Sequence, residues 1–225
     1  MHILNYEELP QGGFAGLLER QFVTDERVFG PKSNPLRFDG IGNFVYLADA
    51  NFTPKGSTGM HGHKEIDVIS VMVQGSIEHA GSLEHGQTLH AGMVQIQRAG
   101  GEGFRHDEIN PDASENHMIQ LWVLPDDAGE PAGYQVFTPQ SGERLQVYGG
   151  SKSQTERFYS RTSIDVALLK QGKSLSHRGE VMVFLCSGEV LINGQKVAAR
   201  TLVRADSIEL EAVNDAQIIL IYSAD

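Results

Sequence analysis

Two pairs of potential metal ligands, each pair separated by one residue, carry the clearest chemistry in this sequence. The first pair is His61 and His63 in a His-Gly-His segment, and the second is His106 and Glu108 in a His-Asp-Glu segment. Residues two apart in a β-strand point to the same face, so each pair can converge on one ion. Together they offer three imidazole nitrogens and one carboxylate oxygen. This donor set predicts one divalent transition metal and suits Fe(II), Mn, Ni, Cu or Zn, without distinguishing among them. Fe(II) is the ion that we expect.

Exposed histidines on an edge strand are the alternative explanation for either pair taken alone, because histidine is often found at the protein surface. The second pair follows the first by 45 positions, and both pairs lie among glycines next to strand-like runs. Two such pairs in one chain favour a metal site over scattered surface histidines.

Short apolar runs rich in Val, Ile and Leu recur along the chain between glycine, proline and aspartate residues. Runs of this length and composition predict strands of a β-barrel or sandwich. The clearest runs are Asp67–Val73, His117–Leu124, Val181–Leu185 and Ile218–Tyr222. Asn193 and Gly194, between two further apolar runs, predict a tight β-hairpin. The fold class indicated is therefore all-β.

Charge and cysteine content restrict the classes of function. The 225 residues include 18 basic and 29 acidic side chains, which gives a net charge of −11. A chain this acidic, without a run of Lys or Arg, is not expected to bind nucleic acid directly. No apolar stretch is long enough to span a bilayer, so no membrane partner is expected. Cys186 is the only cysteine, which fits a reducing, cytoplasmic location.

A cluster of chain-breaking residues from Pro125 to Gly133 divides the chain into two halves. We predict a linker from this cluster to about Gly150. The expected domains are residues 1–130, which contain the metal site, and residues 131–225.

The two halves share a weak internal repeat, because a glycine precedes His61 by five positions and another precedes His177 by five. The first copy continues with His63, whereas the second has Gly179 at the matching position. One neutral ligand binds a divalent ion weakly. The C-terminal domain is therefore expected to lack a metal site.

Several of these segments occur in the same order in pirins, and the sequence resembles that family over roughly residues 56–125. The segments are Met60–Lys64, Asp67–Gly75, Gly103–Glu108 and Gln120–Pro125. The resemblance implies a bicupin, that is, two cupin-type β-barrel domains packed together, with a metal in the N-terminal one. Position by position, the family's ligands fall on the same four residues, His61, His63, His106 and Glu108.

Other residues near these four are also candidates for the site. In cupins generally a carboxylate four residues after the second histidine is often a ligand, and here that residue is Asp67. We favour Glu108 as the ligand and expect Asp67 to orient a ligand imidazole. His117 is expected either in the pocket wall or as a buried, hydrogen-bonded histidine. Trp122 is assigned to packing, and His79, with two later histidines of the same region, to surface turns.

The resemblance implies an enzyme, a metal-dependent dioxygenase of quercetin 2,3-dioxygenase type acting on a flavonol-like aromatic small molecule. Glu108 would then serve both as ligand and as catalytic proton acceptor. The alternative is a non-catalytic regulator that senses the redox state of its metal and binds a protein partner. A structural module without metal is a third hypothesis, which the complete ligand set disfavours.

Overall fold

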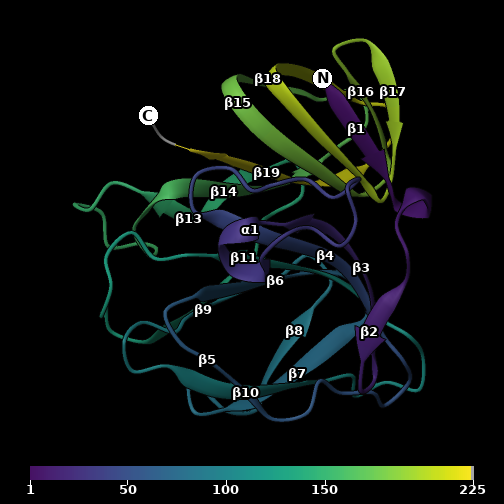
Figure 1. The fold of residues 1–225 in the computed structure, drawn as a ribbon. Helices are drawn as coiled ribbons and strands as arrows, with labels where there is room; N and C mark the ends of the chain where they lie inside the picture. Colours follow the sequence, from purple (N-terminus) through teal and green to yellow (C-terminus); the bar gives the residue numbers. More distant parts are fainter. Residues whose placement is uncertain (224–225) are drawn as a thin grey trace. The chain divides into compact units, whose positions relative to one another are not determined.

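The computed structural model describes residues 1–223 and consists mainly of antiparallel β-strands, so the all-β prediction is confirmed (Figure 1). The strands form two compact units. The N-terminal unit comprises Leu9–Gly40 and Phe44–Thr138, and the C-terminal unit comprises Met1–Glu8, Ile41–Asn43 and the chain from Pro139 onward. Within the described residues, no helix has the length and apolar character needed to cross a membrane.

The N-terminal unit is built from two sheets, which form its two layers in Figure 1. The larger sheet has the order β12-β9-β6-β11-β4-β3-β2. Its strands are β2 (Gly12–Phe14), β3 (Leu17–Thr24), β4 (Phe44–Phe52), β6 (Asp67–Gln74), β9 (Val94–Arg98), β11 (His117–Val123) and β12 (Gly133–Phe137). The smaller sheet has the order β5-β10-β7-β8. Its strands are β5 (His61–His63), β7 (Ser76–Gly81), β8 (Gln87–His90) and β10 (Phe104–Ile109).

One short helix, α1 (Glu26–Phe29), follows β3 and was not predicted from the sequence. Its N-cap is Asp25, whose carboxylate accepts a hydrogen bond from the backbone N–H of Arg27. This cap satisfies one of the free N–H groups of the first turn. The helix places Phe29 against Tyr46, with the two ring centroids 5.5 Å apart.

The C-terminal unit is one sheet of order β13-β14-β19-β15-β18-β16-β17, with β1 added beside β18. Its elements are β1 (His2–Asn5), the 3-10 helix η1 (Tyr6–Glu8), β13 (Arg144–Gly150), β14 (Ser160–Leu169), β15 (Ser174–Ser187), β16 (Glu189–Ile192), β17 (Gln195–Ala198), β18 (Thr201–Ala212) and β19 (Ala216–Ser223). The predicted hairpin joins β16 to β17. Asn193 and Gly194 both have positive φ, at 50° and 80°, as the two turn residues of a tight hairpin require.

The four predicted strand-like runs lie in β6, β11, β15 and β19, apart from Leu124, which follows the end of β11. The predicted linker is wrong. That region holds β12, which pairs with β9, and β13, which pairs with β14. The contact-based boundary falls between Thr138 and Pro139, and β1 joins the C-terminal unit by pairing with β18. Breaker residues mark where strands end, but long-range pairing decides which unit each strand joins.

Candidate metal centre

β5 and β10 pair antiparallel and bring the two predicted ligand pairs to adjacent positions. His106 lies opposite His61 in the register, and Phe104 lies opposite His63. On its other side β10 pairs with β7, where Gly81 faces His106. A Cβ atom on Gly81 would lie 2.5 Å from the carbonyl oxygen of Arg105. The absence of a side chain there lets β7 approach β10 closely behind His106.

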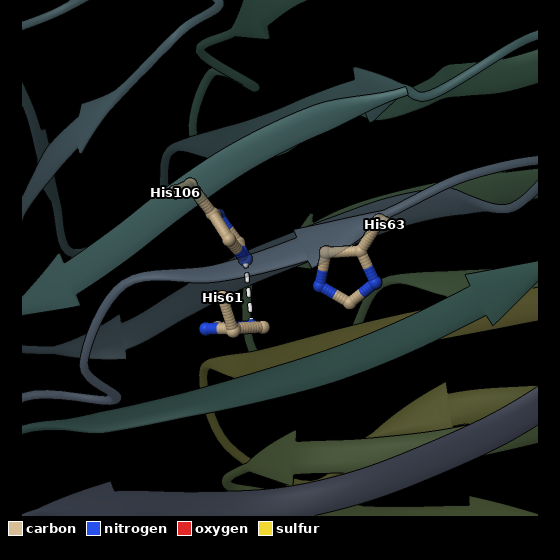
Figure 2. A group of neighbouring side chains, drawn as sticks. All are labelled: His61, His63 and His106. Carbon is tan, nitrogen blue, oxygen red and sulfur yellow. Dashed lines mark hydrogen bonds between the residues drawn. The ribbon is translucent and has the colours of Figure 1, made fainter. Parts of the chain in front are cut away.

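His61, His63 and His106 turn their rings toward one another (Figure 2). One potential ligand atom from each lies within 4.8 Å of the other two. The Nε2 atoms of His61 and His106 are 3.1 Å apart. Two nitrogens bound at about 2.1 Å to one ion, roughly at a right angle, lie about 3 Å apart. The spacing of this pair therefore fits a transition-metal ion.

The hydrogen bond of His61 determines which of its nitrogens is available. Its Nδ1 lies 2.8 Å from the carbonyl oxygen of Gly59. A carbonyl oxygen only accepts, so Nδ1 carries the proton and Nε2 holds a lone pair. The Nε2 atom of His63 is buried and has no hydrogen-bond partner among the described residues. Both observations fit imidazoles arranged to bind a cation.

The interior favours neutral imidazoles. Burial, together with the charge of His61, lowers the pKa of His63 to about 4. Burial, together with His61, His63 and His79, lowers the pKa of His106 to about 2. Only the neutral form of histidine has a lone pair for a metal. These two side chains are therefore in the ligating form throughout the neutral pH range.

Glu108 lies on β10, two residues after His106, and is fully buried. Its carboxylate accepts hydrogen bonds from Ser70 Oγ at 2.8 Å, from Gln95 Nε2 at 3.4 Å and from Gln120 Nε2 at 3.5 Å. Burial raises the pKa of Glu108, and the hydrogen bond from Ser70 opposes that shift. The cluster of ligand atoms within 4.8 Å contains the three histidines and not Glu108. Its role as fourth ligand stays a prediction.

Gln97 is a functional candidate that the sequence analysis missed. Its Nε2 lies 3.1 Å from Nδ1 of His106, whereas its Oε1 is buried without a hydrogen-bond partner in the described chain. A signal for it exists in β9, Val-Gln-Ile-Gln-Arg, where Gln95 and Gln97 alternate with apolar residues. Two amides on one face of a fully buried strand indicate a polar interior.

Three further predicted residues have other partners. Asp67 accepts a hydrogen bond from Arg98 Nε at 3.1 Å. His117 contacts Asp49 through Nε2 at 3.0 Å, so the predicted hydrogen bond is confirmed, although its side chain is partly exposed. The surface-turn prediction for His79 is wrong, because its side chain is buried and its Nε2 lies 2.9 Å from the carbonyl oxygen of Leu83. The β7–β10 pairing buries it, and its ring centroid is 5.6 Å from that of His106.

A cavity of about 250 Å³ opens beside the histidines. Its lining includes four aromatic side chains, two of the three histidines and several polar residues: Phe14, Leu17, Glu19, Gln21, Phe29, Tyr46, Thr58, His61, His63, Gln120 and Trp122. The packing assignment of Trp122 is therefore incomplete, because this ring also lines the cavity, 5.6 Å from the ring of His63. An apolar cavity with a few polar groups is the usual form of a small-molecule site.

Comparison with known proteins gives one family and several relatives. The sequence model of the family "Pirin" matches residues 36–123. A quercetin 2,3-dioxygenase of Escherichia coli K12 is 27% identical over 172 residues, which cover 72% of this chain and 74% of the relative. The chain also resembles the structure of the bacterial pirin YhhW of Escherichia coli in complex with nickel(II), with a TM-score of 0.84, 20% identity and coverage of 100% and 99%. A quercetin 2,3-dioxygenase structure from Acinetobacter baumannii matches with a TM-score of 0.72, 17% identity and coverage of 99% and 85%.

Proposed function

This chain belongs to the pirin family, and we propose that it binds one divalent transition metal and acts as a dioxygenase of quercetin 2,3-dioxygenase type. The fold is that of two cupin-type units, in agreement with the sequence prediction. The observation that carries the proposal is the convergence of three neutral imidazoles, from His61, His63 and His106, beside an apolar cavity.

A divalent metal bound by these nitrogens would lower the pKa of a substrate hydroxyl, so that the reactive anion forms near neutral pH. The aromatic lining supports an aromatic substrate. Phe29, Tyr46 and Trp122 lie in mutual contact, with centroid distances of 4.5 to 5.9 Å. A planar ligand ring enclosed by such side chains is shielded from water.

The chain's own hydrogen bonds prepare the ligand nitrogens. Gly59 holds the proton of His61 on Nδ1, which leaves Nε2 free. His106 must likewise carry its proton on Nδ1 if its Nε2 is to bind the ion. A half-turn of the Gln97 amide turns its Oε1, which has no partner, toward that proton as an acceptor. Gln97 would therefore fix both the tautomer and the orientation of His106.

Glu108 is proposed as the fourth ligand and as the proton acceptor. Supporting this role, it follows His106 on the same strand face, and it accepts hydrogen bonds only from uncharged groups, Ser70, Gln95 and Gln120. No cationic side chain in the described chain forms a salt bridge with its carboxylate. A bound metal ion would therefore supply the positive charge that this buried carboxylate lacks.

Oxygen uptake by the Fe(II)-loaded protein in the presence of quercetin tests the activity. We expect uptake faster than with the His63→Ala variant or with metal-stripped protein, which control for slow oxidation of the flavonol by free iron. Parallel samples with Mn, Ni, Cu and Zn identify the metal that supports turnover. Uptake no faster than in the controls, for every metal and for several flavonols, would contradict the enzyme and favour the regulator that binds a protein partner.

A further inference from the structure

Glu19 is the one carboxylate among the described residues that line the cavity beside the histidines. It lies on β3, where Leu17, Glu19 and Gln21 alternate with Leu18 and Arg20 and all three line the cavity. Glu108 does not line it. The acidic group that a bound ligand meets is therefore Glu19, which is 8% exposed.

Only uncharged donors hold this carboxylate. Gln21 Nε2 donates to Oε1 at 2.7 Å, and the hydroxyl of Tyr46 donates to Oε2 at 2.7 Å. Within the described chain, no lysine, arginine or histidine forms a salt bridge with Glu19. A nearly buried carboxylate without a cationic partner is costly to maintain, which suggests that it has a function.

The neighbouring Tyr46 acts as a hydrogen-bond donor to Glu19 and leaves part of the carboxylate available to a ligand. Burial, followed by the charge of Glu19, raises the pKa of Tyr46 well above its usual value, so the phenol remains protonated and donates. A carboxylate has about four lone-pair sites, and the two hydrogen bonds occupy two of them. The remaining sites can accept a hydrogen bond from a ligand in the cavity.

The cavity limits the size of that ligand. Its volume of about 250 Å³ is below the roughly 300–1,000 Å³ of pockets that enclose drug-sized molecules. The sides are aromatic, and Trp122 forms a centroid contact of 4.5 Å with Tyr46 next to Glu19. These walls fit one ring of an aromatic ligand, with Glu19 facing a substituent of that ring and the rest of a larger ligand outside the cavity.

We propose that Glu19 selects the ligand by accepting a hydrogen bond from an uncharged hydroxyl on an aromatic ring that enters the cavity. A methyl ether cannot donate this hydrogen bond. A carboxylate at the same position would meet the charge of Glu19 in a desolvated site and be repelled. The inference deepens the proposed function and rests on it for the identity of the site. It adds a specificity-determining residue, Glu19. It also adds a ligand class, namely aromatic rings that present a hydroxyl and no anionic group to β3.

Trp122, the single tryptophan of the chain, lines the cavity and serves as a fluorescence probe of binding. Three symmetric ligands, catechol, 1,2-dimethoxybenzene and phthalate, present the same group to Glu19 in either orientation. Each is titrated into zinc-loaded and into metal-stripped protein, because zinc has no redox chemistry and permits no turnover. Glu19→Gln is compared with the wild type and with Glu78→Gln, which changes an exposed glutamate on β7.

We expect the wild type to bind catechol about tenfold more tightly than either other ligand, as for a charge-assisted hydrogen bond. Glu19→Gln should weaken the binding of catechol by about tenfold and strengthen the binding of phthalate. Glu78→Gln should bind all three ligands with the wild-type affinities. The variant can keep its fold, because a glutamine can accept from Tyr46 and donate to a rotated Gln21. Thermal unfolding checks this.

Wild-type ligand preferences that persist in Glu19→Gln would overturn the proposal, as would an absence of any fluorescence change in both forms of the protein. The metal centre is tested separately by zinc content. If zinc does not bind while Glu19 still controls the preferences of metal-stripped protein, the proposed function fails and the role of Glu19 stands.

Discussion

The strand β5, with His61 and His63, and the strand β15, with His177, occupy matching places in the weak internal repeat, yet their surroundings differ in kind. In the C-terminal unit the ring of His177 packs 4.4 Å from that of Tyr222. The buried carboxylate nearby, Asp165, accepts hydrogen bonds from Arg144 Nε at 2.7 Å and from the hydroxyl of Tyr222. Its charge is compensated within the unit.

The N-terminal unit leaves its interior polar groups incompletely bonded. All of the described buried side-chain nitrogen and oxygen atoms that lack a hydrogen-bond partner belong to this unit, and they include His63 Nε2 and Gln97 Oε1. Such atoms cost stability unless something binds them. The C-terminal interior instead contains a large cluster of Val, Leu, Ile and Ala side chains. The interior of the N-terminal unit thus contains polar atoms without partners, whereas the interior of the C-terminal unit contains a large apolar cluster.

The largest difference between the units is expected in metal content. His63→Ala or His106→Ala removes one of three converging imidazoles, so each variant should lose most of the roughly one ion per chain that such a site holds. His177→Ala is the matched control in the C-terminal unit and should lose none. Elemental analysis of protein purified without an affinity tag measures the content. Full metal retention in the His63 and His106 variants, or loss of metal in the His177 variant, would contradict the expected difference in metal binding between the two units.

The next largest effect should follow from Gln97. Gln97→Leu removes the side-chain amide that lies 3.1 Å from Nδ1 of His106. It therefore also removes the oxygen that a half-turn of this amide would present to Nδ1 as an acceptor, and we expect metal affinity to fall about 10–100-fold. Gln97→Glu keeps an acceptor and should restore most of the affinity. Gln146→Leu, which removes a hydrogen bond to Ser163 in the C-terminal unit, is the control. Calorimetric titration gives the affinities, and ¹⁵N NMR reports whether the proton of His106 is on Nδ1. Equal affinities for wild type and Gln97→Leu would refute the role.

The two buried carboxylates should differ in their importance for stability. Asp165→Asn breaks a charge-assisted hydrogen bond to Arg144 and is expected to cost roughly 1–3 kcal/mol of unfolding free energy. Glu108→Gln should cost less in metal-stripped protein, because its hydrogen-bond donors are neutral and an amide can replace the carboxylate. Urea unfolding of both variants measures the difference. A larger loss for Glu108→Gln would show that this residue is mainly structural.

A smaller effect is expected in the pH dependence of stability. The pKa of His63 is about 4 in the folded protein and about 6.5 when unfolded. Between these values the unfolded chain binds more protons, so the free energy of unfolding decreases as the pH falls from 6.5 toward 4. In metal-stripped protein, His63→Ala should make this decrease shallower. His177→Ala should change it less, because burial lowers the pKa of His177 by a smaller amount. Unfolding curves at several pH values test both variants.

The sequence alone determined the features that depend on local spacing. Period-two placement of His61 with His63 gave the convergent pair, and β-branched runs gave β6, β11, β15 and β19. The Asn-Gly pair gave the β16–β17 hairpin. Each of these patterns acts within a few residues, through strand alternation or turn geometry, so it is visible without knowledge of the fold.

Only the tertiary structure decided which distant residues meet. His61 faces His106 because β5 pairs with β10 in one particular register, and Gln97 reaches His106 from β9 in the other sheet. Glu19 and Trp122 likewise meet in the cavity from β3 and β11. Strand partners and registers follow from the packing of the whole unit, and a shift of one residue would turn every side chain to the opposite face. Spacing alone therefore could not show that Gln97 lies beside His106, or that Glu19 is the carboxylate that lines the cavity.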